Sequence, residues 1–291
     1  MNKKENIAII AFHSAGILSC CVVVIILGFM IMLSFPVFSN GMLFNVLTNP
    51  WAPDQGLFGL RSMIFGTCVI AFFALIISFP LSIGCAFFIG VLNPGGYGRY
   101  LKKLVQLMTA IPTVIYGFVG IFLLVPLVRE LSLKGSGMCI LSASIMLAIL
   151  ISPTMILFFV QSFKMVPNNY INALDALGGN SVQKFVHVIL PNAKKGMITG
   201  IILSFGRAVG DTLIALMISG NSVAVPQSVF DSARTLTAHI ALIIASDFDS
   251  IEFKTLFISG ICLYLITSIG VFIAKYLEKT KTIKYADLNY K

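Results

Sequence analysis

Long apolar stretches without any charged residue alternate along the chain with short segments that hold the charges. The charge-free stretches lie between Glu5 and Asp54, Arg61 and Arg99, Lys103 and Arg129, Lys134 and Lys164, and Lys254 and Lys275. Each is at least as long as the roughly 20 residues that a membrane-spanning helix needs. Because the apolar residues are continuous rather than alternating with polar ones, the pattern indicates helices and not the strands of a membrane β-barrel.

We predict six membrane-spanning helices, over residues 8–35, 62–92, 104–128, 138–163, 197–220 and 254–276. The composition agrees with an all-α, polytopic membrane protein, since 58% of the residues are apolar and only 11% are charged. A soluble domain carries about a quarter charged residues. The chain then divides into an N-terminal helix with an external loop (1–56), a transmembrane core (57–278) and a basic tail (279–291).

The basic residues predict the orientation of the spans. Most of the 20 Lys and Arg residues fall at the two termini or in the loops after the second and fourth spans. Loops rich in Lys and Arg stay in the cytoplasm, so we expect both termini there. This distribution also accounts for the formal net charge of +9 without a nucleic-acid partner, and the basic tail is expected to rest on membrane lipid.

The N-terminal stretch and the cysteines have simple interpretations. The first apolar stretch runs to about Phe35, which is too long for the core of a cleaved signal peptide, so we interpret it as a retained span. The six cysteines all fall within predicted spans, at spacings that suit neither a metal ion nor a disulfide framework. We therefore expect no metal site.

The cytoplasmic loop 164–196 is predicted to contain two short amphipathic helices. It reads KMVPNNYINALDALGGNSVQKFVHVILPNAKKG. The apolar spacing predicts a helix over 170–177 that ends at Gly178, and a second helix over 182–189 that Pro191 stops. Such an element can lie on lipid as an interfacial hairpin, or it can dock a soluble partner.

This loop resembles a pattern of ABC importer permeases: E-A-A, three residues, Gly, nine residues, Ile, one residue, Leu-Pro. The matching positions are Asn172, Ala173 and Leu174, then Gly178, Val188, and Leu190 with Pro191. The resemblance implies the type I importer permease fold and docking to a separate ATPase subunit. The docking residues that it implies are Asn172, Ala173, Asp175, Gly178, Leu190 and Pro191, with Asn172 in place of the family's glutamate. The chain has no G-x-x-x-x-G-K-[ST] loop, so ATP and Mg²⁺ are expected on the partner and no cofactor is expected here.

Two charged residues interrupt the fifth predicted span. Arg207 lies about 15 Å into it, close to the midplane, and Asp211, four residues later, would share its helix face. Each charge costs roughly 2.5–3.5 kcal/mol in the bilayer, which marks such residues as functional candidates. The planar donors of arginine suit a tetrahedral oxyanion, and the aspartate would partly neutralise the arginine when no ligand is bound. We predict an anion pathway along this face; the alternative is a structural ion pair between helices.

The segment GRAVGDT around this pair resembles the GRA-x-GET stretch of phosphate-specific ABC permeases. Other similar stretches follow in order: WAPD at 51–54, SFPLSIGCAFFI at 78–89, AIPTVIYGFVGIFLLVPL at 110–127 and ISPTM at 151–155. The resemblance covers roughly residues 50–276, and the tryptophan of the outer loop and Gly206 favour the C-type over the A-type subunit. It departs at Asp211, where the family usually has glutamate.

The resemblance implies partners and a location. A second homologous permease subunit would complete the pathway, two ATP-binding subunits would dock below it, and an extracytoplasmic phosphate-binding protein would deliver the substrate. The chain would lie in a bacterial or archaeal cell (inner) membrane as a multi-pass subunit without enzymatic activity of its own, so no catalytic residue is expected.

Hydroxyl groups near the charged pair are further candidates for the pathway. Pro112 is predicted to lie inside the third span, where it removes a backbone hydrogen bond. Thr113 and Tyr116 follow it, and Thr212 adjoins Asp211. Each hydroxyl can donate to a passing anion or make an ordinary hydrogen bond between helices.

Other functions fit the sequence less well. An intramembrane aspartyl protease would need G-x-G-D and a second aspartate in a span, whereas the chain has Ala208 at the first glycine and no second intramembrane carboxylate. A serine-type intramembrane protease would need a Ser–His pair within the spans. A channel would leave the docking loop unexplained. Within transporters, the alternative to phosphate is another oxyanion such as molybdate, tungstate or sulfate.

Overall fold

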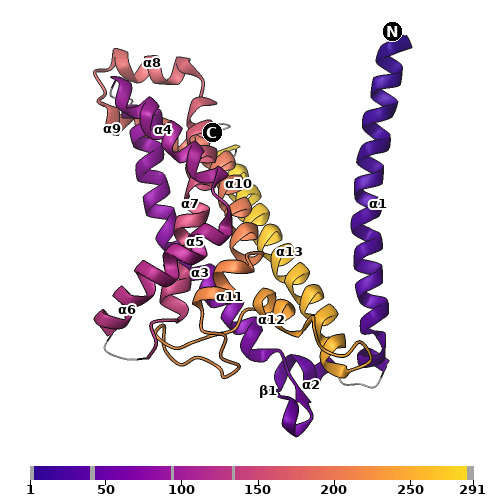
Figure 1. Cartoon of the computed structure of the whole chain (residues 1–291). Coiled ribbons are helices and arrows are strands. Elements are labelled where there is room, and N and C mark those ends of the chain that lie inside the picture. Colours follow the sequence, from indigo (N-terminus) through magenta and orange to yellow (C-terminus); the bar gives the residue numbers. More distant parts are fainter. Residues whose placement is uncertain (1–2, 40–42, 93–94, 133–134, 287–291) are drawn as a thin grey trace.

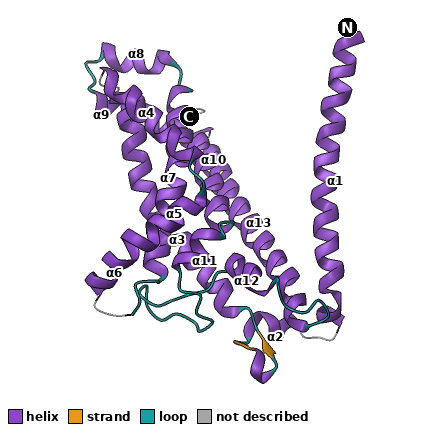
Figure 2. Ribbon diagram, viewed as in Figure 1, coloured by secondary structure: helices purple, strands orange, loops and turns teal. Residues whose placement is uncertain are grey.

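Helices make up almost all of the computed structural model, which describes residues 3–39, 43–92, 95–132 and 135–286 (Figure 2). Five segments have the length and apolar composition of a membrane span: Ile9–Val37, Arg61–Leu92, Thr113–Ser132, Ile140–Lys164 and Ile251–Tyr276. The predicted all-α, polytopic architecture is confirmed. Two of the six predicted spans, 104–128 and 197–220, are interrupted.

The centre of the molecule is α7 (Ile140–Lys164), which packs against α3 (Arg61–Phe87) and α10 (Leu190–Val209). Small side chains let these helices approach closely. The hydroxyl oxygens of Ser78 and Ser152 lie 3.0 Å apart between α3 and α7. A single π-helical turn, η2 (Phe88–Leu92), extends α3. This packed core fixes α7 as the framework against which the other elements are placed.

The first helix, α1 (Lys3–Ser39), stands apart from the body over most of its length (Figure 1). It meets α13 (Ile251–Ala286) toward one end, where the ring centroids of Phe29 and Phe257 lie 6.4 Å apart. The exposed apolar side chains of α1 carry no penalty in a bilayer, since lipid tails are as apolar as they are. Figure 1 also shows that α1 begins and α13 ends at the end of the molecule that carries α8 (Asn168–Ala176).

The third predicted span is broken at Ile111–Pro112. It consists of α4 (Gly95–Ala110), α5 (Thr113–Val119), a π-helical turn η3 (Gly120–Leu124) and α6 (Val125–Ser132). The expectation that Pro112 lies inside a helix is therefore wrong: it is the residue that precedes α5.

The break has an identifiable partner. Proline has no N–H to offer the carbonyl four residues earlier, which is that of Met108. The Tyr116 hydroxyl donates to this carbonyl at 3.0 Å. Tyr116 therefore ties the two helix segments together across the break.

The fifth predicted span is also broken. α10 ends at Val209, and α11 (Leu213–Ile218) follows after three residues. At its other end α10 continues a π-helical turn, η4 (Lys184–Ile189), so Pro191 does not stop the preceding helix as predicted. Pro191 lies just after this π-helical turn, whose bonding includes the Leu190 amide to the Phe185 carbonyl. A widened turn of this kind can accommodate a residue without an N–H.

A small hairpin and a short helix form the opposite end of the molecule from α8 (Figure 1). The helix α2 (Leu43–Thr48) leads to the antiparallel strands β1 (Trp51–Ala52) and β2 (Leu57–Phe58), joined by the turn η1 (Pro53–Gln55). Trp51 pairs with Phe58 in the register. The Trp51 ring packs edge-on against His239 of α12 (Leu236–Ile243), with ring centroids 4.4 Å apart.

His239 is completely buried, and neither ring nitrogen has a hydrogen-bond partner. Burial, helped by the positive charge of Arg234, lowers its pKa from 6.5 to about 3. The unfolded chain, whose histidine keeps an ordinary pKa, therefore binds more protons than the folded one below about pH 6.5. The free energy of unfolding must decrease as the pH falls from there toward 3.

We expect His239→Leu to remove this part of the pH dependence. The wild-type chain should lose up to about 1.4 kcal/mol of stability per pH unit between pH 6 and 4, and the variant less. Thermal unfolding in detergent at pH 7, 6, 5 and 4 measures both slopes. His187→Leu, at an exposed histidine, is the control. Equal slopes for wild type and His239→Leu would contradict the assignment.

Candidate functional site

A hollow of about 540 Å³ lies where the two broken spans come together. Its lining residues come from the start of α5, the end of α10, the break and the start of α11: Thr113, Gly206, Arg207, Gly210, Asp211, Thr212 and Leu213. Four of the five predicted pathway residues, Arg207, Asp211, Thr212 and Thr113, thus line one space. The fifth, Tyr116, is buried beside the α4–α5 break, and its hydroxyl is used there.

Arg207 is held by a residue that the sequence did not single out. Its Nη1 donates to the Thr154 hydroxyl oxygen at 3.0 Å. Thr154 follows Pro153 within α7. The two partners are 53 positions apart, so no local pattern could pair them; a hydroxyl beside a proline in an apolar span was the available signal.

Asp211 and Arg207 line the same hollow and their opposite charges attract, but the two side chains are not in contact. No ion pair joins the two side chains, both of which belong to the described residues. The Asp211 carboxylate instead accepts a hydrogen bond from the backbone N–H of Ile214 at 2.9 Å. The expectation of a shared helix face is wrong because the helix ends at Val209, before the chain has made the turn that would place Asp211 above Arg207.

The backbone of the break bonds both to α10 itself and to a helix distant in sequence. The Asp211 carbonyl accepts a hydrogen bond from the Thr237 hydroxyl of α12 at 2.7 Å, and the Gly210 amide donates to Gly206 at 3.0 Å. Irregular backbone at membrane depth is tolerated only where it is buried in protein or lines a watery cavity, and this break does both. Interrupted spans that meet at mid-membrane depth are typical of transporter binding sites.

A second candidate surface is the loop between α7 and α10. Its first helix, α8, ends at Ala176, and Gly178 turns the chain with a φ of +75°, the left-handed conformation that glycine adopts without strain. The next helix, α9 (Ser181–Gln183), is capped by reciprocal hydrogen bonds of 2.9 Å between Asn180 and Gln183. An ion pair between Lys184 and Asp175 joins the two arms. The predicted pair of helices at this position is confirmed.

The predicted docking residues of this loop fall into two groups. Asn172, Ala173, Asp175 and Gly178 are exposed, whereas Leu190 and Pro191 are half-buried at the start of α10. Leu190 packs against the apolar core beneath the loop. A hollow of about 380 Å³ opens between α8 and η4, lined by Tyr170, Ala173, Leu174, Leu177, His187, Val188 and Asn192. The exposed group can face a partner, and the half-buried pair shapes the base of the loop.

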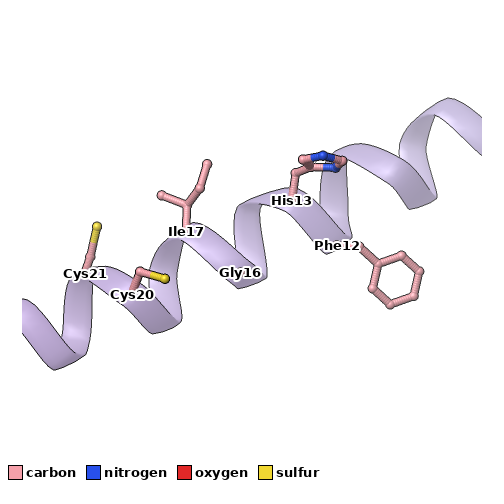
Figure 3. Close-up of a pocket in the computed structure, with 6 residues that line it drawn as sticks. All are labelled: Phe12, His13, Gly16, Ile17, Cys20 and Cys21. Atoms are coloured by element: carbon pink, nitrogen blue, oxygen red, sulfur yellow. The ribbon is translucent and has the colours of Figure 1, made fainter. Parts of the chain in front are cut away.

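A third hollow, on α1, is not a convergent site. Its lining residues, Phe12, His13, Gly16, Ile17, Cys20 and Cys21, all belong to one helix. Figure 3 shows that these side chains do not converge on a common point. In the part of the chain that the structure describes, no three His, Cys, Asp or Glu side chains are grouped so that they could hold a metal ion.

Comparison with known proteins matches the chain to membrane transport components. Residues 79–282 match the family described as "Binding-protein-dependent transport system inner membrane component". The phosphate transport system permease protein PstC of Pasteurella multocida is 30% identical over 84% of this chain and 81% of its own. The probable PstC of Methanocaldococcus jannaschii is 31% identical over 75% of each chain. The probable ABC transporter permease protein YqgH of Bacillus subtilis is 29% identical over 80% of this chain and 76% of its own.

Solved structures agree at the level of the fold. A chain of the MetNI methionine ABC transporter, in an inward-facing conformation, superposes with a TM-score of 0.59 at 19% identity. The match covers 75% of this chain and 95% of that one. A chain of an amino acid ABC transporter superposes with a TM-score of 0.54 at 13% identity, over 76% of this chain and 92% of that one.

Proposed function

The chain belongs to the family of binding-protein-dependent transport system inner membrane components, and from this premise we propose that it is a permease subunit of an ATP-driven importer of inorganic phosphate. Its relatives of about 30% identity include phosphate transport permeases of the PstC type. The observation that carries the proposal is the hollow at the two helix breaks, with Arg207 at its wall and, among the described residues, no carboxylate in ion-pair contact with it. The relatives are transport components, so no protease function is proposed.

The hollow suits a small anion in physical terms. A guanidinium in a low-dielectric environment attracts an anion more strongly than it would in water, and its planar donors can bind two oxygens of a tetrahedral oxyanion. Thr113 and Thr212 add hydroxyl groups to the same wall. A transport site must bind its ligand and also release it, and a single positive charge holds an anion less tightly than several would.

We propose that this subunit assembles with three other kinds of chain. A second, similar permease subunit would form the other half of the pathway, because this chain offers one arginine at one side of the hollow. Two ATP-binding subunits would dock on the exposed face of α8 and supply ATP hydrolysis with Mg²⁺. An extracytoplasmic phosphate-binding protein would meet the opposite end, where β1, β2 and α12 lie. Both termini and α8 would then face the cytoplasm.

Uptake by cells tests the proposed function. Cells whose other phosphate importers are inactive are compared with and without this chain, using labelled phosphate at limiting concentration. We expect uptake to fall to background without the chain and to return when the wild-type chain is supplied. Uptake that does not depend on the chain would remove the phosphate assignment.

A further inference from the structure

We propose that the two charged residues at the helix break have separate tasks: Asp211 is a positioning residue whose carboxylate caps the first turn of α11, while Thr154 holds the Arg207 guanidinium beside the hollow without forming an ion pair. The inference rests on the proposed function, since it concerns how the same site presents its charge. It replaces the expectation that Asp211, on the same helix face as Arg207, serves mainly to neutralise it when no ligand is bound.

The Asp211 carboxylate is engaged as a helix cap. The first amides of a helix have no partner within it, and α11 begins next to the break. Thr212, the residue directly before α11, makes no side-chain bond to the helix. The Asp211 carboxylate, one residue earlier, takes this role: it accepts from the Ile214 amide three residues later, at 2.9 Å, the spacing at which a capping side chain bonds the first turn. The side chain is only 9% exposed, so water offers these amides little alternative.

The chemistry of capping favours aspartate at this position over glutamate. Short side chains such as Asp, Asn and Ser reach the amides of the first turn without distortion. Glutamate has one more methylene and typically serves at the third helical position instead. The similar stretch of phosphate-specific ABC permeases has glutamate at this position. Aspartate at position 211 is therefore the residue expected if its role is to cap α11.

The main chain of Asp211 is fixed from the other side. Its carbonyl accepts from the Thr237 hydroxyl at 2.7 Å, and this hydroxyl lies 2.9 Å from that of Thr235 at the start of α12. A residue bonded through both its side chain and its carbonyl cannot swing toward Arg207 without breaking the first bond. The carboxylate thus belongs to the framework of the break.

Thr154 provides Arg207 with a partner that carries no charge. A hydroxyl can accept a hydrogen bond from the guanidinium at 3.0 Å, which fixes its direction but leaves its charge in place. A carboxylate partner would compete with an incoming anion for the same donors. Because α7 is the most buried of the five spans, its hydroxyl is a rigid anchor.

Two substitutions at Asp211 separate capping from charge. Asparagine caps as well as aspartate, so Asp211→Asn should keep phosphate uptake within about threefold of wild type. Asp211→Glu keeps the charge and loses the cap, and should lower the maximal rate at least about fivefold. Both are measured as initial rates in proteoliposomes that hold the complete transporter, with the recovered amount of each complex determined.

The relative transport rates of these two variants decide whether Asp211 acts as a cap. An inactive Asp211→Asn, with the complex recovered at wild-type amounts, would show that the charge is required and would overturn the capping role. So would an Asp211→Glu variant that transports at the wild-type rate. Absence of phosphate transport by the wild-type assembly would instead count against the proposed function itself.

The role of Thr154 is tested by measuring the KM for phosphate and the maximal transport rate separately. Thr154→Val has the same shape without the hydroxyl and should raise the KM for phosphate about tenfold, the effect of losing one hydrogen bond to a charged group. Thr154→Ser keeps the hydroxyl and should restore the KM. A Thr154→Val variant with the wild-type KM, or a Thr154→Ser variant as impaired as Thr154→Val, would overturn the role of Thr154.

Discussion

Replacing Arg207 by alanine is expected to abolish phosphate uptake, with a loss of at least about 100-fold, while the subunit still assembles. An anion that leaves water for the hollow must be compensated by charge, and hydrogen bonds to a charged group contribute about 1.5–3 kcal/mol each, so two of them account for a factor of this size. Arg207→Lys keeps the charge but loses the planar pair of donors, and should retain a small part of the rate. Initial uptake of labelled phosphate into proteoliposomes measures both variants.

The control for this experiment is Arg129→Ala. Arg129 is an exposed arginine near the end of α6 and does not line the hollow. The Arg129→Ala variant should transport at the wild-type rate. All three variants, Arg207→Ala, Arg207→Lys and Arg129→Ala, should co-purify with the ATPase subunit. Wild-type uptake by Arg207→Ala would remove Arg207 from the pathway.

Replacing Gly178 by proline is expected to separate the permease from its ATPase and to stop transport. Gly178 has a φ of +75°, and its amide donates to the Asp175 carbonyl at 3.0 Å. Proline fixes φ near −65° and has no amide hydrogen, so the end of α8 must change direction and its exposed face must move. Co-purification of the ATPase and phosphate uptake are the two measurements.

The matched control is Gly56→Pro in the hairpin at the other end of the molecule. Gly56 also ends a short helix, with a φ of +69° and an amide that donates to Pro53 at 2.9 Å. The local damage is therefore alike, but the site lies far from α8 (Figure 1). ATPase binding should survive Gly56→Pro. A Gly178→Pro variant that still co-purifies with the ATPase and transports normally would refute the docking role of the loop.

The regular part of the fold could be predicted because it depends on local composition. The predicted spans 62–92 and 138–163 differ from the helical segments Arg61–Leu92 and Ile140–Lys164 by no more than two residues at either end. Apolar continuity over about 20 residues has few alternatives to a spanning helix. The turn at Gly178 followed in the same way from the conformational freedom of glycine.

The two helix breaks could not be predicted from the same signal, because each depends on a particular hydroxyl group that bonds the interrupted backbone. The break at Pro112 is closed by the Tyr116 hydroxyl, and the break at Gly210 is closed by Thr237 of α12. An apolar stretch looks the same whether or not such partners exist. For this reason the sequence pointed to four residues that line the hollow but did not reveal Thr154 as the partner of Arg207.

The most direct test of the central claim is competition in proteoliposomes that hold the complete transporter and ATP. Labelled phosphate is supplied at a limiting concentration, and unlabelled molybdate, tungstate or sulfate is added in excess. We predict ATP-dependent uptake that unlabelled phosphate suppresses and the other oxyanions leave unchanged. Suppression by molybdate, tungstate or sulfate at concentrations where phosphate itself is a weak competitor would contradict the phosphate assignment.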